Sequence, residues 1–187
     1  MATQSHSLLI SAEEFLRMDF GPDRKFELVD GVIRMMTGGT VGHARIQARL
    51  IRHVGNALAG SACEAFGPDI GIRIDEKTVR YADVSIFCGK RDDLAFDNEK
   101  MASDPIIVFE VLSPSTSRTD QCEKLAEYQS LPSVAMIVII EPTVGFIRTL
   151  QRTGEQGWQD SGLIAQTSLD LPTLGVSIPV DAIFSRR

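Results

Sequence analysis

One stretch of the sequence decides the fold: Ile106-Ile107-Val108-Phe109-Glu110-Val111-Leu112-Ser113-Pro114-Ser115-Thr116. Ile106–Leu112 is an almost continuous apolar run, which is typical of a strand buried in a core, and the turn-forming residues after it end the strand. Glu110 interrupts this run. Because burial of an ionised carboxylate costs several kcal/mol unless a partner compensates its charge, Glu110 points to a functional site.

A second acidic residue, Asp83, lies in another predicted strand, Val79–Phe87. Two carboxylates in strands of core character suggest a shared cation, and a hard divalent metal, Mg²⁺ or Mn²⁺, prefers such oxygen ligands. The main-chain carbonyl of Val111 is a natural third ligand. The alternative is purely structural: Asp83 faces solvent on an alternating strand, and Glu110 caps the end of its strand.

Lys124 lies in a predicted helix, Thr119–Leu131, and shares one helix face with Asp120 and Tyr128. Hydrolysis of a phosphodiester benefits from a cation that steadies the attacking water and the developing negative charge. From the residues alone, an ordinary Asp–Lys surface pair is the preferred interpretation of this spacing.

Three further features are weaker candidates. Glu27 and His43 could complete a metal shell through water or act as a base, although isolated residues of these types are more often polar surface residues. The hydroxyl groups of Ser113–Thr116 could donate to a phosphate, and they serve equally well as a turn and helix cap.

The remaining pattern predicts an α/β fold, a mixed β-sheet flanked by helices, with an N-terminal helix and β-hairpin. Ser11 and Glu14 form a capping-box signature, and Asp30-Gly31 is a strong hairpin signal. In chain order, the other predicted elements are helix Ala12–Met18, strands Lys25–Val29 and Val32–Met36, helix Gly42–Leu58, strand Cys63–Ile74, strand Val134–Ile140 and a hairpin of Thr143–Gln151 with Trp158–Gly162.

Length and composition predict a single domain over residues 1–187, with a core of about 10–150 and a C-terminal hairpin and tail over 143–187. The net charge of −6 counts against a protein that coats nucleic acid non-specifically. The three cysteines, which lack the spacing of a zinc site, are interpreted as reduced thiols. No signal peptide or membrane-spanning run is expected, and a cytoplasmic location follows from these expectations.

With these residues in view, the chain resembles the Uma-type putative restriction endonucleases, a branch of the PD-(D/E)XK nuclease superfamily common in cyanobacteria. The resemblance covers roughly residues 10–150 and is carried by several matching stretches: Phe26–Gly31, Gly42-His43 with Ile46 and Leu50, Tyr81–Val84, Val108–Thr116, and Asp120, Lys124 and Tyr128. Two positions depart from the family pattern: Ala82 stands where Pro is usual, and Val32 stands where many members carry Glu.

The resemblance implies a restriction-endonuclease-like core in which Asp83 and Glu110 bind the metal and Lys124 supplies the catalytic lysine, with Glu27 as a candidate for a further acidic ligand. The leading hypothesis is therefore a Mg²⁺- or Mn²⁺-dependent DNA endonuclease, with a homodimer suited to cutting both strands of a duplex. The first alternative hypothesis is a catalytically inactive module of nuclease fold that binds nucleic acid or has a regulatory role. The second is an interaction protein whose carboxylates are merely solvated.

Overall fold

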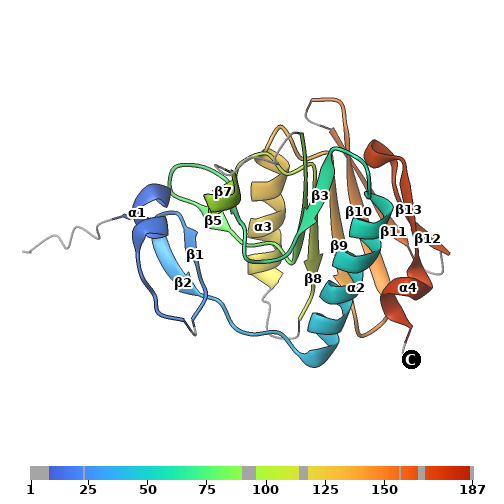
Figure 1. Cartoon of the computed structure of the whole chain (residues 1–187), viewed down its shortest axis with the longest axis horizontal. Helices are drawn as coiled ribbons and strands as arrows, with labels where there is room; N and C mark the ends of the chain where they lie inside the picture. Colours follow the sequence, from blue (N-terminus) through green and yellow to red (C-terminus); the bar gives the residue numbers. More distant parts are fainter. Residues whose placement is uncertain are drawn as a thin grey trace, which may run out of the picture.

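A mixed sheet forms the centre of the molecule (Figure 1), as the sequence predicted. The computed structural model describes residues 9–22, 24–89, 96–113, 118–155, 157–163 and 167–185, without the side chains of 118–120 and 163. The sheet has the strand order β11-β10-β9-β8-β6-β3, in which β8 and β9 are parallel and all other neighbours are antiparallel. Its strands are β3 (Cys63–Phe66), β6 (Val84–Cys88), β8 (Ile107–Val111), β9 (Met136–Glu141), β10 (Phe146–Thr153) and β11 (Gly157–Leu163).

Helices cover both faces of this sheet. The long helix α2 (Val41–Ala57) packs Ile46, Leu50 and Val54 against one face, together with alternate residues of β8 such as Phe109. Helix α3 (Arg118–Ser130) covers the opposite face, where Tyr128 is fully buried. Because α3 connects the parallel strands β8 and β9, it forms the crossover that such a pair requires.

The C-terminal tail completes the core on the α2 side. It consists of β12 (Ser168–Leu171), the 3₁₀ helix η2 (Pro172–Leu174), β13 (Val176–Pro179) and α4 (Val180–Phe184), with β12 and β13 forming a separate two-stranded sheet. Leu169, Leu171 and Ile178 are buried in the same cluster as the residues of α2. No helix in the described parts of the chain is both long and apolar enough to cross a membrane.

A second sheet with the order β2-β1-β5-β4-β7 lies at the N-terminal side of the molecule (Figure 1). Its hairpin turns through Asp30 and Gly31, whose φ angles of 50° and 77° fit the expected two-residue turn. The predicted capping box of Ser11 and Glu14 begins α1 (Ala12–Arg17). The strands are β1 (Phe26–Val29), β2 (Val32–Met35), β4 (Gly71–Arg73), β5 (Val79–Arg80) and β7 (Met101–Ala102), and the 3₁₀ helix η1 (Phe96–Asn98) precedes β7.

Two strand predictions were wrong because the chain crosses from one sheet to the other. The predicted strand Cys63–Ile74 is divided into β3 and β4, and the predicted strand Val79–Phe87 is divided into β5 and β6. The break in the first run contains Gly67 and Pro68, which are poor strand residues. As a result of the second break, Asp83 lies directly before β6 and not inside a strand.

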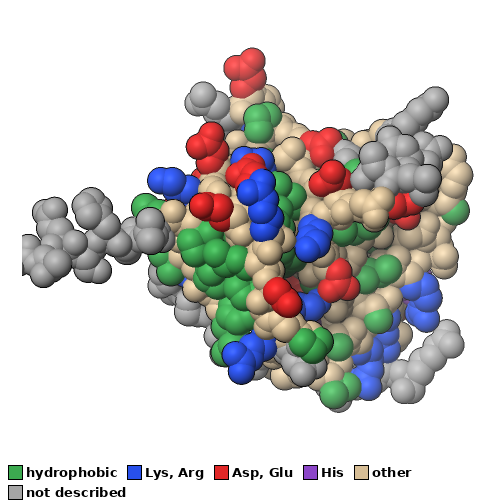
Figure 2. Space-filling model, turned by 60° about the vertical axis from the view of Figure 1, so that its left-hand side comes forward, with side chains coloured by type: hydrophobic (Ala, Val, Ile, Leu, Met, Phe, Trp, Pro, Cys, Tyr) green, Lys and Arg blue, Asp and Glu red, His purple; other side chains and the backbone are tan. Residues whose placement is uncertain are grey.

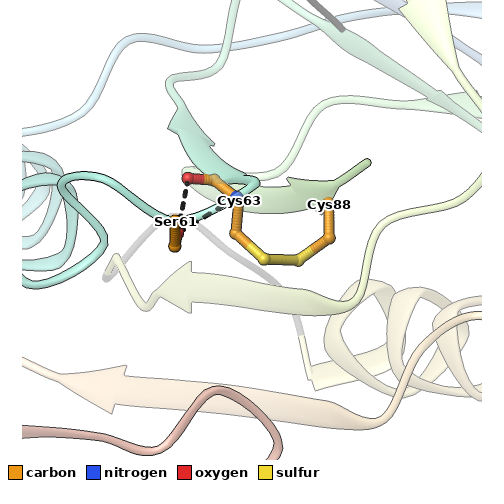
Figure 3. The surroundings of a disulfide bond; sticks show 3 residues. All are labelled: Ser61, Cys63 and Cys88. Carbon is orange, nitrogen blue, oxygen red and sulfur yellow. Dashed lines mark hydrogen bonds between the residues drawn. A yellow bond between two sulfur atoms is a disulfide. The ribbon is translucent and has the colours of Figure 1, made fainter. Parts of the chain in front are cut away.

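The interpretation of three reduced thiols was also wrong, because Cys63 and Cys88 form a disulfide (Figure 3). The two residues are directly opposite each other in the antiparallel pair β3–β6, with Cα atoms 4.0 Å apart. The main-chain N–H of Cys63 also donates to the hydroxyl of Ser61 (3.1 Å). Residues 25 positions apart showed no pairing in the sequence, since only the strand register brings them together. Cys122 is an exposed free cysteine.

Candidate active site

The antiparallel pairing of β6 with β8 brings Asp83 and Glu110 together. Val84 pairs with Phe109, so the start of β6 lies beside the end of β8. The main-chain N–H of Val111 donates a hydrogen bond of 2.7 Å to Oδ2 of Asp83. Both carboxylates therefore lie at the same end of the sheet, as the shared-cation hypothesis requires.

The first turns of α2 hold the Asp83 carboxylate from the other side. Nε2 of His43 lies 3.1 Å from Oδ2 of Asp83, and the amide of Gln47 donates to Oδ1 (3.3 Å) and to the main-chain oxygen (3.1 Å). The hydrogen bond with Asp83 raises the pKa of His43 above its ordinary value, and burial opposes this rise. Thr40 caps the helix by accepting from the N–H of His43, which fixes the start of α2 beside Asp83.

Helix α3 supplies the partners of Glu110. The hydroxyl of Tyr128 donates to Oε1 of Glu110 (2.7 Å), and Nζ of Lys124 lies 3.8 Å from the same oxygen. The side chain of Lys124 is only 14% exposed, so its interpretation as half of a surface pair was wrong. Burial raises the pKa of Glu110 to about 7, the negative charges of Asp83 and Glu27 add to this, and Lys124 and Tyr128 oppose it.

Glu27 reaches the same region from β1. Its Oε1 accepts a 2.8 Å hydrogen bond from Arg80, and its Oε2 lies 4.0 Å from Nζ of Lys124. Oε2 is buried and has no hydrogen-bond partner in the structure. Lys124 thus lies between two carboxylates, those of Glu27 and Glu110.

These side chains surround one cavity of about 360 Å³, which Glu27, His43, Asp83, Glu110, Lys124 and Tyr128 help to line. Arg34 of β2 lies at the same cavity with a side chain that is 46% exposed. The face shown in Figure 2 carries an area of hydrophobic side chains with basic and acidic side chains beside it. This face is not uniformly positive, in keeping with the net charge of −6.

The structure places most of the predicted site residues together. His43 contacts Asp83, and Ser113 lines the cavity, whereas Pro114, Ser115 and Thr116 and the side chain of Asp120 lie outside the described residues. Two residues escaped the sequence interpretation: Gln47, which follows His43 by one helical turn, and Arg80. For Arg80 the available signal was a charged residue near the start of the predicted strand Val79–Phe87.

The oxygen donors of Asp83, Glu110 and Val111 are of the kind that would suit a hard cation with water molecules in its remaining coordination positions. Among the residues that the structure describes, no three His, Cys, Asp or Glu side chains form a group that could hold a metal ion. Two carboxylates with a main-chain carbonyl would leave the remaining positions to water or a phosphate, which is the usual arrangement for Mg²⁺. Oε2 of Glu27 is buried and accepts no hydrogen bond, although Nζ of Lys124 lies 4.0 Å away, so there is room in its bonding for a water molecule of a bound cation.

The comparison with solved structures concerns the fold. A crystal structure described as a "putative nuclease belonging to DUF820", from Anabaena variabilis, matches with a TM-score of 0.77 and covers 94% of this chain and 98% of that one. The sequence identity is 17%, so this likeness shows the fold: the chain has a nuclease-like fold.

The family follows from the sequence. The Uma2 family, described as "Putative restriction endonuclease", matches residues 12–181, and the chain belongs to this family. Two relatives from Synechocystis sp. are similar over most of their lengths, although both are called uncharacterized proteins. The first, slr1290, is 31% identical over 94% of this chain and 91% of its own length, and sll1609 is 24% identical over 86% and 90%.

Proposed function

We propose that this protein is a Mg²⁺- or Mn²⁺-dependent endonuclease that hydrolyses phosphodiester bonds of DNA. The observation that carries the proposal is the convergence of Asp83, Glu110 and Lys124 on one cavity, from three separate parts of the chain. Membership of the restriction endonuclease family and the nuclease-like fold support a nuclease role.

In this proposal Asp83, Glu110 and the main-chain carbonyl of Val111 hold the metal ion. When bound, the metal polarises the scissile phosphate and lowers the pKa of a water molecule. A divalent cation also relieves the repulsion between the carboxylates, which contributes to the raised pKa of Glu110.

The other residues of the cavity have distinct roles. The ammonium group of Lys124 stabilises the negative charge that develops on the phosphate, and its position between Glu27 and Glu110 keeps it directed into the cavity. Tyr128 orients Glu110 through its hydroxyl, and His43 with Gln47 orients Asp83. Glu27 is the second acidic residue next to Lys124 and a further candidate for the reaction.

Cleavage of both strands of a duplex suits a homodimer, in which the two-fold axis of the protein matches that of the DNA. We propose this assembly, and a cytoplasmic location, as part of the same function. With a net charge of −6, single basic residues such as Arg34 at the cavity, and not a broad basic surface, would contact the phosphates.

The direct test is cleavage of supercoiled plasmid DNA in Mg²⁺ or Mn²⁺. The wild type is expected to nick or linearise the plasmid, and Asp83→Asn, Glu110→Gln and Lys124→Met are each expected to lose on the order of 100-fold in rate. Asp170→Asn is the matched control, because Asp170 lies in β12 and hydrogen-bonds to Ser168 and Ser177, away from the cavity. Cleavage that persists in Asp83→Asn and Glu110→Gln would exclude this site.

The rival function is an inactive nuclease-fold module that binds nucleic acid. It predicts that the wild type binds DNA in a filter or gel-shift assay but never cuts it, with either metal. An RNA substrate in the same assay separates ribonuclease from deoxyribonuclease activity.

A further inference from the structure

Arg80 is the most deeply enclosed charged residue of the described chain. It ends β5, its exposed fraction is 0%, and it is among the largest fully buried side chains. A guanidinium group buried in this way is tolerated only when carboxylates or other acceptors surround it. Its partners therefore show what Arg80 does.

Two carboxylates from different elements hydrogen-bond with Arg80, and Oε2 of Glu123 in α3 lies 3.9 Å from its Nη2. Nε and Nη2 donate to the two oxygens of Glu127 in α3, at 2.6 and 2.9 Å, and Nη1 donates to Oε1 of Glu27 in β1, at 2.8 Å. The bidentate pair with Glu127 fixes the plane of the guanidinium. Arg80 thereby connects β1 and β5 to α3, the helix that carries Lys124.

This arrangement fixes which oxygen of Glu27 lies beside Lys124. Oε1 is engaged by Arg80, whereas Oε2 has no hydrogen-bond partner and lies 4.0 Å from Nζ of Lys124. The same Nζ is 3.8 Å from Glu110, so the ammonium group is shared between the two carboxylates at nearly equal distances. Without Arg80, Lys124 would be the nearest cation left to neutralise Glu27, and the two would form a direct pair.

We propose that Arg80 is a positioning residue for the active site: by holding Oε1 of Glu27, it prevents Glu27 from capturing Lys124 and keeps the lysine ammonium directed toward Glu110 and the cavity. The catalytic consequence rests on the proposed nuclease function. The effect on Lys124 itself does not, so the two can be tested separately.

Arg152 provides a matched control. It also contacts the end of α3, where it donates to the main-chain oxygens of Gln129 and Leu131, and it lies over the ring of Trp158 at 4.4 Å. Arg152→Gln removes an anchor of α3 without changing the charge around Glu27. If the role of Arg80 were purely structural, Arg80→Gln and Arg152→Gln would change the reactivity of Lys124 alike, each in proportion to its loss of stability.

The first experiment measures the chemical reactivity of Lys124, with no need for activity. The full-length protein is treated with the N-hydroxysuccinimide ester of acetic acid at one fixed pH, and the acetylation of Lys124 relative to the exposed Lys77 is followed by mass spectrometry. Arg80→Gln is expected to slow acetylation of Lys124 severalfold, because the amine becomes paired with Glu27, and Arg152→Gln is expected to leave it unchanged. Equal reactivity of Lys124 in the wild type and Arg80→Gln, or an equal change in Arg152→Gln, would overturn the proposal.

The second experiment tests the catalytic consequence by plasmid cleavage. Arg80→Gln is expected to lower kcat by at least about tenfold with little change in KM, since misplacement of a catalytic group acts on the chemical step. In a Glu27→Gln background, Arg80→Gln is expected to lower kcat no further, because Arg80 acts through Glu27. An additive loss in the double variant would contradict this route.

Glu127→Gln keeps the test decisive if Arg80→Gln does not fold. It loosens the bidentate anchor of Arg80 and retains the guanidinium, so it is expected to change Lys124 reactivity in the same direction and by less; no change would overturn the proposal. If the wild type cuts no DNA while Lys124 reactivity responds as expected, the nuclease function fails and the positioning role stands.

Discussion

At the scale of single residues, Glu110 is a carboxyl group whose charge changes near neutral pH. Burial raises its pKa to about 7, so in the metal-free protein this carboxyl is partly protonated at pH 7. A bound divalent cation favours the ionised form and would release this proton. Metal affinity is therefore expected to rise with pH through this range.

The same shift predicts how stability depends on pH. The folded-state pKa lies above the ordinary value of 4.5, so the folded protein binds the Glu110 proton more tightly than the unfolded chain. The contribution of Glu110 to the free energy of unfolding therefore falls as pH rises from about 4.5 to 7, by at most about 3 kcal/mol. Glu110→Gln, measured by urea unfolding in EDTA, is expected to flatten this decline. Glu64→Gln, at an exposed position of β3, is the control, and an unchanged slope in Glu110→Gln would contradict the assignment.

His43 gives a prediction of the same sign at higher pH, because its pKa is raised from a higher ordinary value. Its hydrogen bond with Asp83 raises its pKa, so it stabilises the fold fully below pH 6.5 and loses this contribution as pH rises through the raised pKa. His43→Gln should thus destabilise the protein more at pH 6 than at pH 9. His53→Gln, in the same helix but without a contact to Asp83, is the control for this measurement by urea unfolding.

At the scale of elements, the disulfide cross-links β3, the edge strand of the central sheet, to its neighbour β6. It closes a loop of 25 residues, and the loss of chain entropy in the unfolded state predicts a stabilisation of about 3 kcal/mol. A reducing agent is therefore expected to lower the Tm of the wild type. The double variant Cys63→Ser/Cys88→Ser is expected to have this lower Tm even when no reducing agent is present. Cys122→Ser should retain the full response to the reducing agent, and a wild-type Tm that ignores the reducing agent would contradict the pairing.

The sequence predicted elements whose signal is local. The capping box at Ser11, the turn at Asp30-Gly31 and the apolar spacing of α2 each depend on neighbouring residues, and each appears as expected. The strand crossings between the two sheets, the disulfide and the packing of β12 and β13 against α2 depend on contacts between distant segments. The spacing of apolar residues along the chain does not show which distant segments come into contact.

At the scale of the whole molecule, the cavity lies where several independent parts of the chain meet. Asp83 precedes β6, Glu110 lies in β8, Lys124 in α3 and Glu27 in the N-terminal sheet. The carboxylates were recognisable in the sequence because charge is costly in apolar strands. Arg80 carried the same kind of signal, a charge in a predicted strand, whereas Gln47 did not, because its importance comes from a partner that only the fold supplies.

The ion pairs that join the N-terminal sheet to α3 give a prediction for the fold as a whole. Arg80→Met leaves Glu27 and Glu127 without their common cation, and breaking such a buried group is expected to destabilise the protein by about 3–5 kcal/mol. Arg34→Met removes a pair with Glu123 that is nearly half exposed, and about 1 kcal/mol or less is expected there. Urea unfolding of both variants measures the contrast, and equal losses would contradict it.

The central claim is that Asp83 and Glu110 form one divalent-cation site, and calorimetric titration of the wild type with Mn²⁺ tests it most directly. We predict saturable binding that is abolished in both Asp83→Asn and Glu110→Gln and retained in Asp170→Asn. Wild-type binding that survives in either of the first two variants, or no binding to the wild type, would contradict the claim.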